Sequence, residues 1–440
     1  MVDKPLVAEE SGWARPKPLR WLYLDMNAYF ASVEQAEDPS LVGKPVAVVP
    51  MLADSTFIIA ASRECKKLGV KTGARVGDAK AVIPDIVLIP GRPALYVHYH
   101  RRIQEVTEQV LPINKVCSID EMRFRLLGHE REPDEAKGIA GRIKEALAEG
   151  VSPVMTASIG IAPNSFLAKL GTDLMKPDGL VVIESKDLPE KIRGLKLTEF
   201  CGINRKMEAR LKAAGIFTSD DLIGKTEQEL RRAFQSVLGA RWWHLIRGEE
   251  LTEEVEAQKS LSHSHVLPPE LRTRQGARDV LLRLAHKAAA RLRSKGLEAG
   301  SLAVYVSGRG KGWDAHTHLD GCQDTFSLIQ EILKLWEGAD FDSCQQVGLN
   351  LTDLFPFGTR TPSLFSDLEK KQESVKASQA MDALNQKFGK NSIYLASLEK
   401  VKGTASEKIA FNKTWLFEEG KGDHEWPNTF QGIQKPRDEA

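Results

Sequence analysis

Apolar and polar positions alternate along the first half of the chain in an order that predicts strands and helices. The stretch "WLYLDMNAYFASVEQAEDP" predicts a strand that runs into a helix, and a Gly- and Pro-punctuated segment then leads to a second apolar strand. Further along, the pattern predicts a helix over 94–110, two strands over 115–127 and a helix over 131–149. A strand, a helix and a strand follow in "VMTASIGIAPNSFLAKLGTDLMKPDGLVVI". This βα, ββ, αβ order predicts a ferredoxin-like split sheet, in which the first strand lies beside the hairpin.

Two adjacent carboxylates interrupt the predicted hairpin, in the stretch "KVCSIDEMRFRL". Asp120 and Glu121 stand among residues of strand character, where acids are depleted. Like charges about 4 Å apart repel by roughly 4 kcal/mol at an effective dielectric near 20, so the pair needs solvent, protonation or a cation. A solvated hairpin tip is the simplest interpretation of this stretch alone. The predicted sheet, however, places Asp25 near the pair, and three carboxylates on neighbouring strands form an oxygen cage suited to Mg²⁺.

Composition restricts the class of protein. A chain of 440 residues is too long for one core, so we expect two to four domains, and 42% hydrophobic residues suffice to build them. The five cysteines lack CxxC spacing, which disfavours a zinc site or a disulfide framework. The sequence contains no run of about 18 apolar residues, so we expect a soluble, cytoplasmic protein with no membrane partner. The net charge of +1 does not indicate nucleic-acid binding, but residues 259–311 are strongly basic.

Three segments of the chain resemble the signature motifs of a known protein family. The stretches "LDMNAYFASVE", "CSIDE" and "SIGIAPNSFLAKLGTDLMKPDG" are similar, in order and spacing, to the signature segments of the Y-family translesion DNA polymerases. The resemblance covers about residues 20 to 355, and Asn27 is typical of the bacterial SOS-type (DinB/UmuC-like) branch. It implies a right-hand polymerase of α/β and α+β domains that performs low-fidelity, mutagenic translesion synthesis on primer-template DNA with deoxynucleoside triphosphates, as a monomer.

The resemblance also implies roles for single residues. Asp25, Asp120 and Glu121 would bind two catalytic Mg²⁺ ions, for which Mn²⁺ substitutes, with the Met26 carbonyl as a further ligand. Phe30 falls where the family places an aromatic steric gate against the nucleotide 2′-hydroxyl, and Lys169 corresponds to the lysine that reaches the triphosphate. Taken singly, a phenylalanine at position 30 is more often a plain core residue, and a lysine at position 169 is more often a solvated helix residue.

One position pair departs from the family pattern. In "AASRECKKLGVKTG", many members have Tyr and Arg three residues apart to hold the triphosphate, whereas this chain has Arg63 and Lys66. Both cations are able to bind phosphate. Lysine is less able to make bidentate contacts, so the expected result is weaker nucleotide binding or a differently arranged pocket.

The resemblance divides the chain into parts. The predicted parts are an N-terminal leader (1–19), a catalytic palm (20–36 and 90–185), small fingers (37–89), a thumb (186–251), a linker (252–259), a little finger (260–357) and a C-terminal tail (358–440). In the thumb, "LTEFCGINRKMEARLKAAGIFTSDDL" resembles a helix-hairpin-helix that holds a DNA phosphate, although its "GIN" turn departs from the commoner Gly-x-Gly.

The little finger begins with a basic helix. Six basic residues punctuate its amphipathic pattern, and we expect some of them to form its solvated face and others to contact DNA phosphates. These residues are Arg278, Arg283, Lys287, Arg291, Arg293 and Lys295.

The tail contains a short peptide with two apolar anchors. "RTPSLFSDLEKKQ", with Leu364 and Phe365, resembles the peptides by which bacterial polymerases bind the sliding clamp, although the usual leading Gln is absent. A chance Leu-Phe pair in a linker is the alternative. The stretch "SQAMDALNQKFGKNSIYLASL" beyond it resembles the tail of the SOS-type branch and carries no functional prediction.

Two other functions remain open from the sequence. A catalytically silent family member that acts as a scaffold in a mutagenesis complex is disfavoured by the intact Asp25, Asp120 and Glu121, but the altered positions 63 and 66 are compatible with it. A two-metal nuclease or a nucleotide cyclase on the same split sheet is disfavoured by the thumb and little-finger segments.

Overall fold

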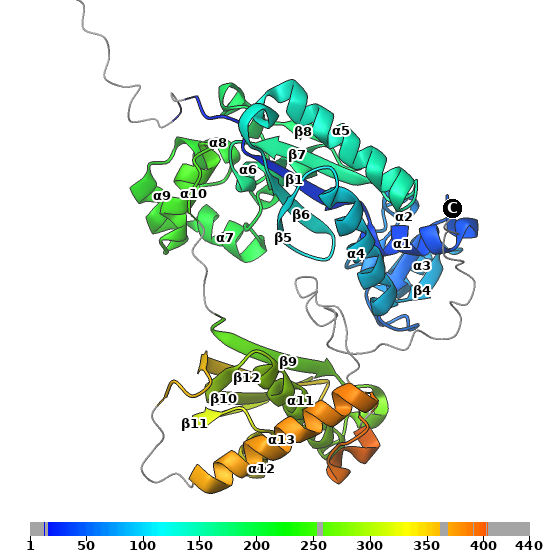
Figure 1. Cartoon of the computed structure of the whole chain (residues 1–440), viewed down its shortest axis with the longest axis vertical. Coiled ribbons are helices and arrows are strands. Elements are labelled where there is room, and N and C mark those ends of the chain that lie inside the picture. The colour runs from blue at the N-terminus through cyan, green and yellow to red at the C-terminus, as the bar shows by residue number, and fades with distance from the viewer. Residues whose placement is uncertain are drawn as a thin grey trace, which may run out of the picture. The chain divides into compact units, whose positions relative to one another are not determined.

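The computed structural model describes residues 13, 16–252, 258–360, 368–389, 391–401 and 403 (Figure 1). Of these, the residues up to 252 form one compact unit and those from 258 onward form a second. Most of the predicted leader and linker, together with Leu364 and Phe365, lie outside the described residues. Among the described helices, none has the length and apolar character needed to cross a membrane.

A five-stranded sheet forms the centre of the first unit (Figure 1). Its strand order is β5-β6-β1-β7-β8, with β1 antiparallel to both β6 and β7. The four strands β7-β1-β6-β5 have the ferredoxin-like order, and β8 adds a parallel edge strand beside β7. The predicted split sheet is therefore confirmed. The strands are β1 (Trp21–Met26), β5 (Ile113–Val116), β6 (Glu121–Arg125), β7 (Ala157–Ala162) and β8 (Leu180–Val182).

Side chains of β1 alternate between the two faces of this sheet. Trp21 and Tyr23 share a core with Leu167 of α6 (Ser165–Leu174), a helix that packs on β1 and β7. Because side chains two residues apart lie on the same face of a strand, Asp25 belongs to the face that α6 covers. The predicted helices on either side of the hairpin are α4 (Pro93–Glu108) and α5 (Pro133–Gly150), which pack against each other.

A smaller three-stranded sheet, in the order β3-β2-β4, follows the first helix of the chain. Its helix α2 (Arg63–Lys67) begins at Ser62, whose hydroxyl accepts a hydrogen bond from the Cys65 N–H at 3.3 Å. This cap starts the helix beside the small sheet and places Arg63 on its first turn. The remaining elements are α1 (Tyr29–Glu37), β2 (Val46–Val49), β3 (Ala60–Ala61), α3 (Val76–Val82) and β4 (Val87–Pro90).

Four short helices complete the first unit around a core that contains Trp242. At the predicted "GIN" turn, Gly202 has a φ of 98°, a conformation that glycine adopts without strain. Asn204 then caps the next helix by accepting a hydrogen bond from the Met207 N–H at 2.9 Å. Glu250 ties this helical part to the central sheet by accepting a hydrogen bond from the Trp21 indole at 3.0 Å. The helices are α7 (Arg205–Ala213), α8 (Ser219–Gly224), α9 (Glu227–Phe234) and α10 (Leu238–Ile246).

The second unit is a four-stranded antiparallel sheet with helices packed against it (Figure 1). The strand order is β11-β10-β12-β9, and the long helix α11 contacts β9, β10 and β12. Its elements are β9 (Ser260–Val266), α11 (Arg274–Ser294), β10 (Leu297–Ser307), β11 (Trp313–Cys322), α12 (Thr325–Glu337) and β12 (Gln346–Pro356).

The basic residues of α11 are more buried than the sequence predicted. Arg283 and Arg291 are only 9% and 8% exposed, and the side chain of Arg293 is 5% exposed. The guanidinium of Arg293 makes two hydrogen bonds to Asp382, at 2.6 and 2.9 Å. For these three residues the expected solvated face is therefore wrong, because other elements of the second unit cover the helix. Contact of this helix with DNA phosphates stays a prediction.

Part of the predicted tail packs against the second unit. Helix α13 (Leu368–Phe388) carries Asp382 and contacts α11 and α12. The 3-10 helix Ala396–Val401 follows, and its Leu398 and Val401 are buried in the same core as α11. The stretch beyond residue 357 that carried no functional prediction thus contributes a structural layer to this unit.

Candidate active site

The strand register brings the three predicted carboxylates together. Asp25, next to the end of β1, lies directly opposite Glu121, the first residue of β6. The Met26 N–H donates a hydrogen bond to the Asp120 carbonyl oxygen at 2.9 Å. The three acids therefore meet at one end of two paired strands, as the predicted sheet required.

Two lysines neutralise part of this negative charge. Lys169 Nζ on α6 forms ion pairs with Asp25 and, at 2.9 Å, with Glu121 Oε1. Lys176 Nζ lies 2.8 Å from Asp25 Oδ2 and 2.8 Å from Asp173 Oδ1. Burial by itself would lower the pKa of both ammonium groups, but the neighbouring carboxylates outweigh it and raise the pKa. Both lysines are therefore charged at neutral pH.

Asp120 has a different environment from the other two acids. Its carboxylate accepts a hydrogen bond from the Ser118 hydroxyl at 2.5 Å. Burial raises the pKa of Asp120, and the negative charges of Asp25 and Glu121 raise it further, against the lowering effect of Ser118. A carboxylate in such surroundings is stabilised in its charged form by a cation.

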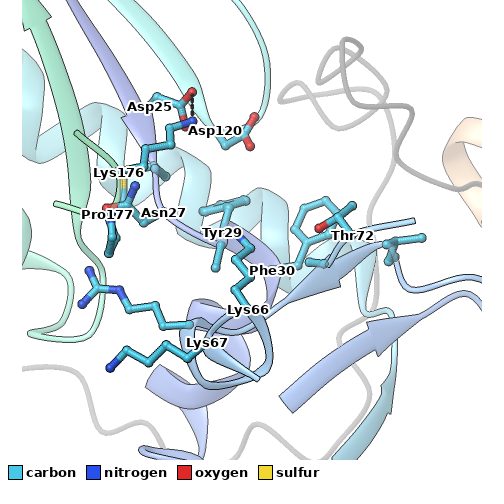
Figure 2. A pocket seen from close by; sticks show the side chains of 15 residues that line it. Asp25, Asn27, Tyr29, Phe30, Lys66, Lys67, Thr72, Asp120, Lys176 and Pro177 are labelled. Carbon is cyan, nitrogen blue, oxygen red and sulfur yellow. Dashed lines mark hydrogen bonds and ion pairs between the residues drawn. The ribbon is translucent and has the colours of Figure 1, made fainter. Parts of the chain in front are cut away.

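A cavity of about 490 Å³ opens beside the carboxylates (Figure 2). Figure 2 shows Asp25 and Asp120 on one side of it, and Lys66 and Lys67 on the other. Burial lowers the pKa of Lys66, and the nearby positive charge of Lys176 lowers it further. The cavity therefore has carboxylates at one end and several positively charged side chains in its wall. Its lining consists of Asp25, Met26, Asn27, Ala28, Tyr29, Phe30, Ile59, Ala60, Arg63, Lys66, Lys67, Thr72, Asp120, Lys176 and Pro177.

The two expected triphosphate cations, both on helix α2, reach this cavity. Lys66 and Arg63 both line it. The Arg63 guanidinium donates a hydrogen bond to the Thr156 hydroxyl, which in turn donates to Asn27 Oδ1 at 3.2 Å. Asn27 Oδ1 also accepts from the Asp178 N–H at 2.7 Å. Asn27 therefore connects the end of β1 with Arg63 and with the turn that follows Lys176.

Lys169 does not lie among the cavity-lining residues in the described part of the chain, whereas Lys176 does. The family resemblance assigned Lys169 to the triphosphate and gave Lys176 no role. The sequence feature that could have indicated Lys176 is "LMKPDG", at the end of the third signature segment, where this lysine precedes a proline-containing turn. Helical spacing alone does not distinguish two lysines seven residues apart.

Phe30 is at once a buried residue and part of the cavity wall. It is 5% exposed, and its ring stacks on Tyr96 with the ring centroids 4.2 Å apart. Tyr96 is held in turn, because its hydroxyl donates a hydrogen bond to Glu34 Oε1 at 2.6 Å. The neighbouring Tyr29 also lines the cavity and donates a hydrogen bond to the Tyr96 carbonyl oxygen at 2.5 Å.

The donor set suits a hard divalent cation. The described residues contain no cluster of three or more His, Cys, Asp or Glu side chains arranged around one metal position. The ammonium group of Lys169, however, forms ion pairs with both Asp25 and Glu121, so the oxygens of these two carboxylates point to a single cation. Carboxylate and carbonyl oxygens are the usual ligands of Mg²⁺. The residues present therefore fit such an ion.

A ferredoxin-like sheet with carboxylates at a strand end, beside a basic cavity, is typical of the palm of nucleotide polymerases. Family models match residues 24–173, as the impB/mucB/samB family, and residues 258–364, as the C-terminal domain of that family. The chain therefore belongs to the Y family of DNA polymerases, in its DinB-like branch, and is a DNA-directed DNA polymerase. Membership of this family implies a dependence on divalent metal ions.

Relatives match over nearly their whole length. The DNA polymerase IV of Moorella thermoacetica is 31% identical over 387 residues, which cover 85% of this chain and 95% of the relative. DNA polymerase IV 1 of Bacillus subtilis is 28% identical, with 91% and 98% covered. A solved chimaeric Y-family polymerase built from Dbh and Dpo4 matches with a TM-score of 0.64 at 24% identity, over 77% of this chain and 99% of that chain. At this identity the structural match shows the shared fold.

Proposed function

We propose that this polymerase performs low-fidelity translesion synthesis by two-metal-ion nucleotidyl transfer. The primer 3′-hydroxyl attacks the α-phosphate of a deoxynucleoside triphosphate, an O–P bond forms, and pyrophosphate leaves. The observation that carries the proposal is the meeting of Asp25, Asp120 and Glu121 at the edge of a cavity lined by Arg63, Lys66 and Lys176. Intact carboxylates beside a basic cavity favour an active enzyme over a silent scaffold.

Each residue has a task in this proposal. Asp25, Asp120, Glu121 and the Met26 carbonyl hold the divalent ions, Mg²⁺ or in its place Mn²⁺, which supply positive charge to the attacking and leaving oxygens. Lys66 and Lys176 bind the triphosphate from opposite elements of the cavity, and Arg63 assists while held by Thr156. Phe30 excludes the 2′-hydroxyl.

DNA is bound without sequence readout, as a polymerase requires. The short helices α7 and α8 and the second unit are the proposed contacts with primer-template phosphates. Action as a monomer and a mutator role in the SOS response belong to the same proposal and rest on the resemblance. Location in the cytoplasm belongs to the proposal as well.

Primer extension tests the proposal. The full chain, supplied with Mg²⁺ and all four deoxynucleotides, is expected to extend a primer on an undamaged template and to insert a nucleotide opposite an abasic site. The products are read on a denaturing gel. If the protein binds primer-template DNA but extends the primer on neither template, the proposed translesion synthesis fails and the scaffold alternative is supported.

The clamp peptide is a separate prediction. Leu364 and Phe365 lie outside the described residues, so the proposal rests on the similarity of "PSLFSDL" to clamp-binding peptides. Changing both to Ala is expected to leave clamp-free synthesis unchanged and to remove stimulation by a bacterial sliding clamp, because the two anchors are distant in sequence from Asp25, Asp120 and Glu121. Extension rates with and without the clamp measure this. Equal stimulation of the double mutant and the wild type would assign clamp binding elsewhere.

A further inference from the structure

Lys169 occupies the centre of the carboxylate site rather than the nucleotide cavity. Its ammonium bridges Asp25 and Glu121 across the β1–β6 pair, and its side chain is only 17% exposed. The opposite oxygen of Glu121 accepts a hydrogen bond from the Tyr23 hydroxyl at 2.8 Å, and Lys169 Nζ lies 5.6 Å from the centre of the Tyr23 ring. The ammonium is therefore held at a defined place between the two acids.

We infer that Lys169 is an internal counter-cation, which competes with a divalent ion for Asp25 and Glu121 and withdraws when that ion binds. The inference rests on the proposed metal site. An ammonium and a metal ion both need the same carboxylate oxygens, so the two cations compete. Lys169 thus lowers the affinity of the free enzyme for metal and keeps the two acids in place until metal arrives.

The surroundings of Lys169 supply the position to which it withdraws. Thr172 Oγ1 lies 3.4 Å from Lys169 Nζ, and Asp173 Oδ2 lies 3.8 Å away on the same helix. A lysine has a flexible four-carbon stem, so its ammonium moves toward these oxygens by side-chain rotation alone. Helix α6 itself stays packed on β1 and β7.

Lys176 provides an internal comparison. It also pairs with Asp25, but its other partner is Asp173 rather than Glu121, and its side chain is 37% exposed. Its ammonium therefore does not bridge Asp25 and Glu121. Removing Lys169 takes away the ammonium that pairs with both Asp25 and Glu121 and leaves the ion pair of Lys176 with Asp25. Repulsion among the acids then rises, and the affinity of the site for a metal ion rises with it.

Metal affinity tests the inference directly. Mn²⁺ is titrated into the full chain without DNA or nucleotide, and free Mn²⁺ is measured by electron paramagnetic resonance. We expect Lys169→Gln and Lys169→Met to bind Mn²⁺ about five-fold more tightly than the wild type, because the competing cation is gone. Lys169→Arg keeps the charge and is expected to keep the weaker affinity. Lys137→Gln, which removes an exposed lysine paired with Asp134, is the matched control.

Thermal stability separates this role from simple packing. Lys169→Gln is expected to melt below the wild type in EDTA and to regain most of the difference in Mn²⁺. An equal loss in both conditions, or unchanged Mn²⁺ affinity in Lys169→Gln and Lys169→Met, overturns the inference. Asp25→Asn is measured alongside. If Asp25→Asn binds Mn²⁺ like the wild type, the proposed metal site itself fails, whereas loss of binding in that variant leaves the site standing.

Discussion

Asp120→Asn is expected to abolish primer extension while DNA binding stays intact or becomes slightly tighter. Asn keeps the shape of the side chain and an oxygen that accepts the hydrogen bond from Ser118, but it removes the negative charge. Burial raises the pKa of Asp120, and the neighbouring charges of Asp25 and Glu121 raise it further, so losing its charge relieves both the cost of burial and the repulsion within the protein. The same loss removes a metal ligand and weakens repulsion of the primer phosphates.

Two measurements on one protein sample check this result. Primer extension with Mg²⁺ gives the rate, and fluorescence anisotropy of a labelled primer-template at fixed salt gives the DNA affinity. Asp134→Asn, at an exposed carboxylate on α5, is the matched control and is expected to retain wild-type extension. Extension by Asp120→Asn at more than a few per cent of the wild-type rate would sink the metal-ligand assignment.

Phe30→Ala is expected to raise the relative efficiency of ribonucleotide over deoxyribonucleotide insertion by at least about ten-fold, or about 1.4 kcal/mol of lost discrimination. The ring lines the cavity and is fixed from behind by its stacking on Tyr96. A ring that cannot retreat leaves no room for a 2′-hydroxyl, and discrimination then comes from the clash. Truncation to Ala removes the clash.

The competing explanation is that Phe30 serves only the core. Truncating a packed Phe then costs roughly 3 to 5 kcal/mol of stability, with no change in sugar preference. Single-nucleotide insertion kinetics for both sugars, with the melting temperature of the same variant, distinguish the two. Tyr29→Phe, which keeps a ring in the cavity wall and loses only the hydroxyl bonded to the Tyr96 carbonyl, is the control and is expected to leave the sugar ratio within about two-fold. An unchanged sugar ratio in Phe30→Ala with a large melting loss refutes the gate.

The linear pattern of residues was enough to predict the palm sheet and the place of its acids. Alternating apolar residues mark the strands, and the order of strands and helices along the chain was enough to place β1 beside β6. Asp25 and Glu121 then face each other because strand pairing brings the end of one strand to the beginning of the other. These features depend on local periodicity and on neighbouring elements, which a linear pattern contains.

Which charged side chains are buried, and which of them share a site, depends on how distant elements of the fold pack together. Arg293 lies in a basic stretch whose pattern predicts a solvated helix face. In the structure it pairs with Asp382, which is 89 residues further along, and α13 packs against its helix. Lys169 and Lys176 are equivalent as residues of one signature segment, yet one bridges the acids and the other lines the cavity. The physical reason is that the environment of a charge depends on elements distant in sequence, whose packing supplies the partners and excludes the water.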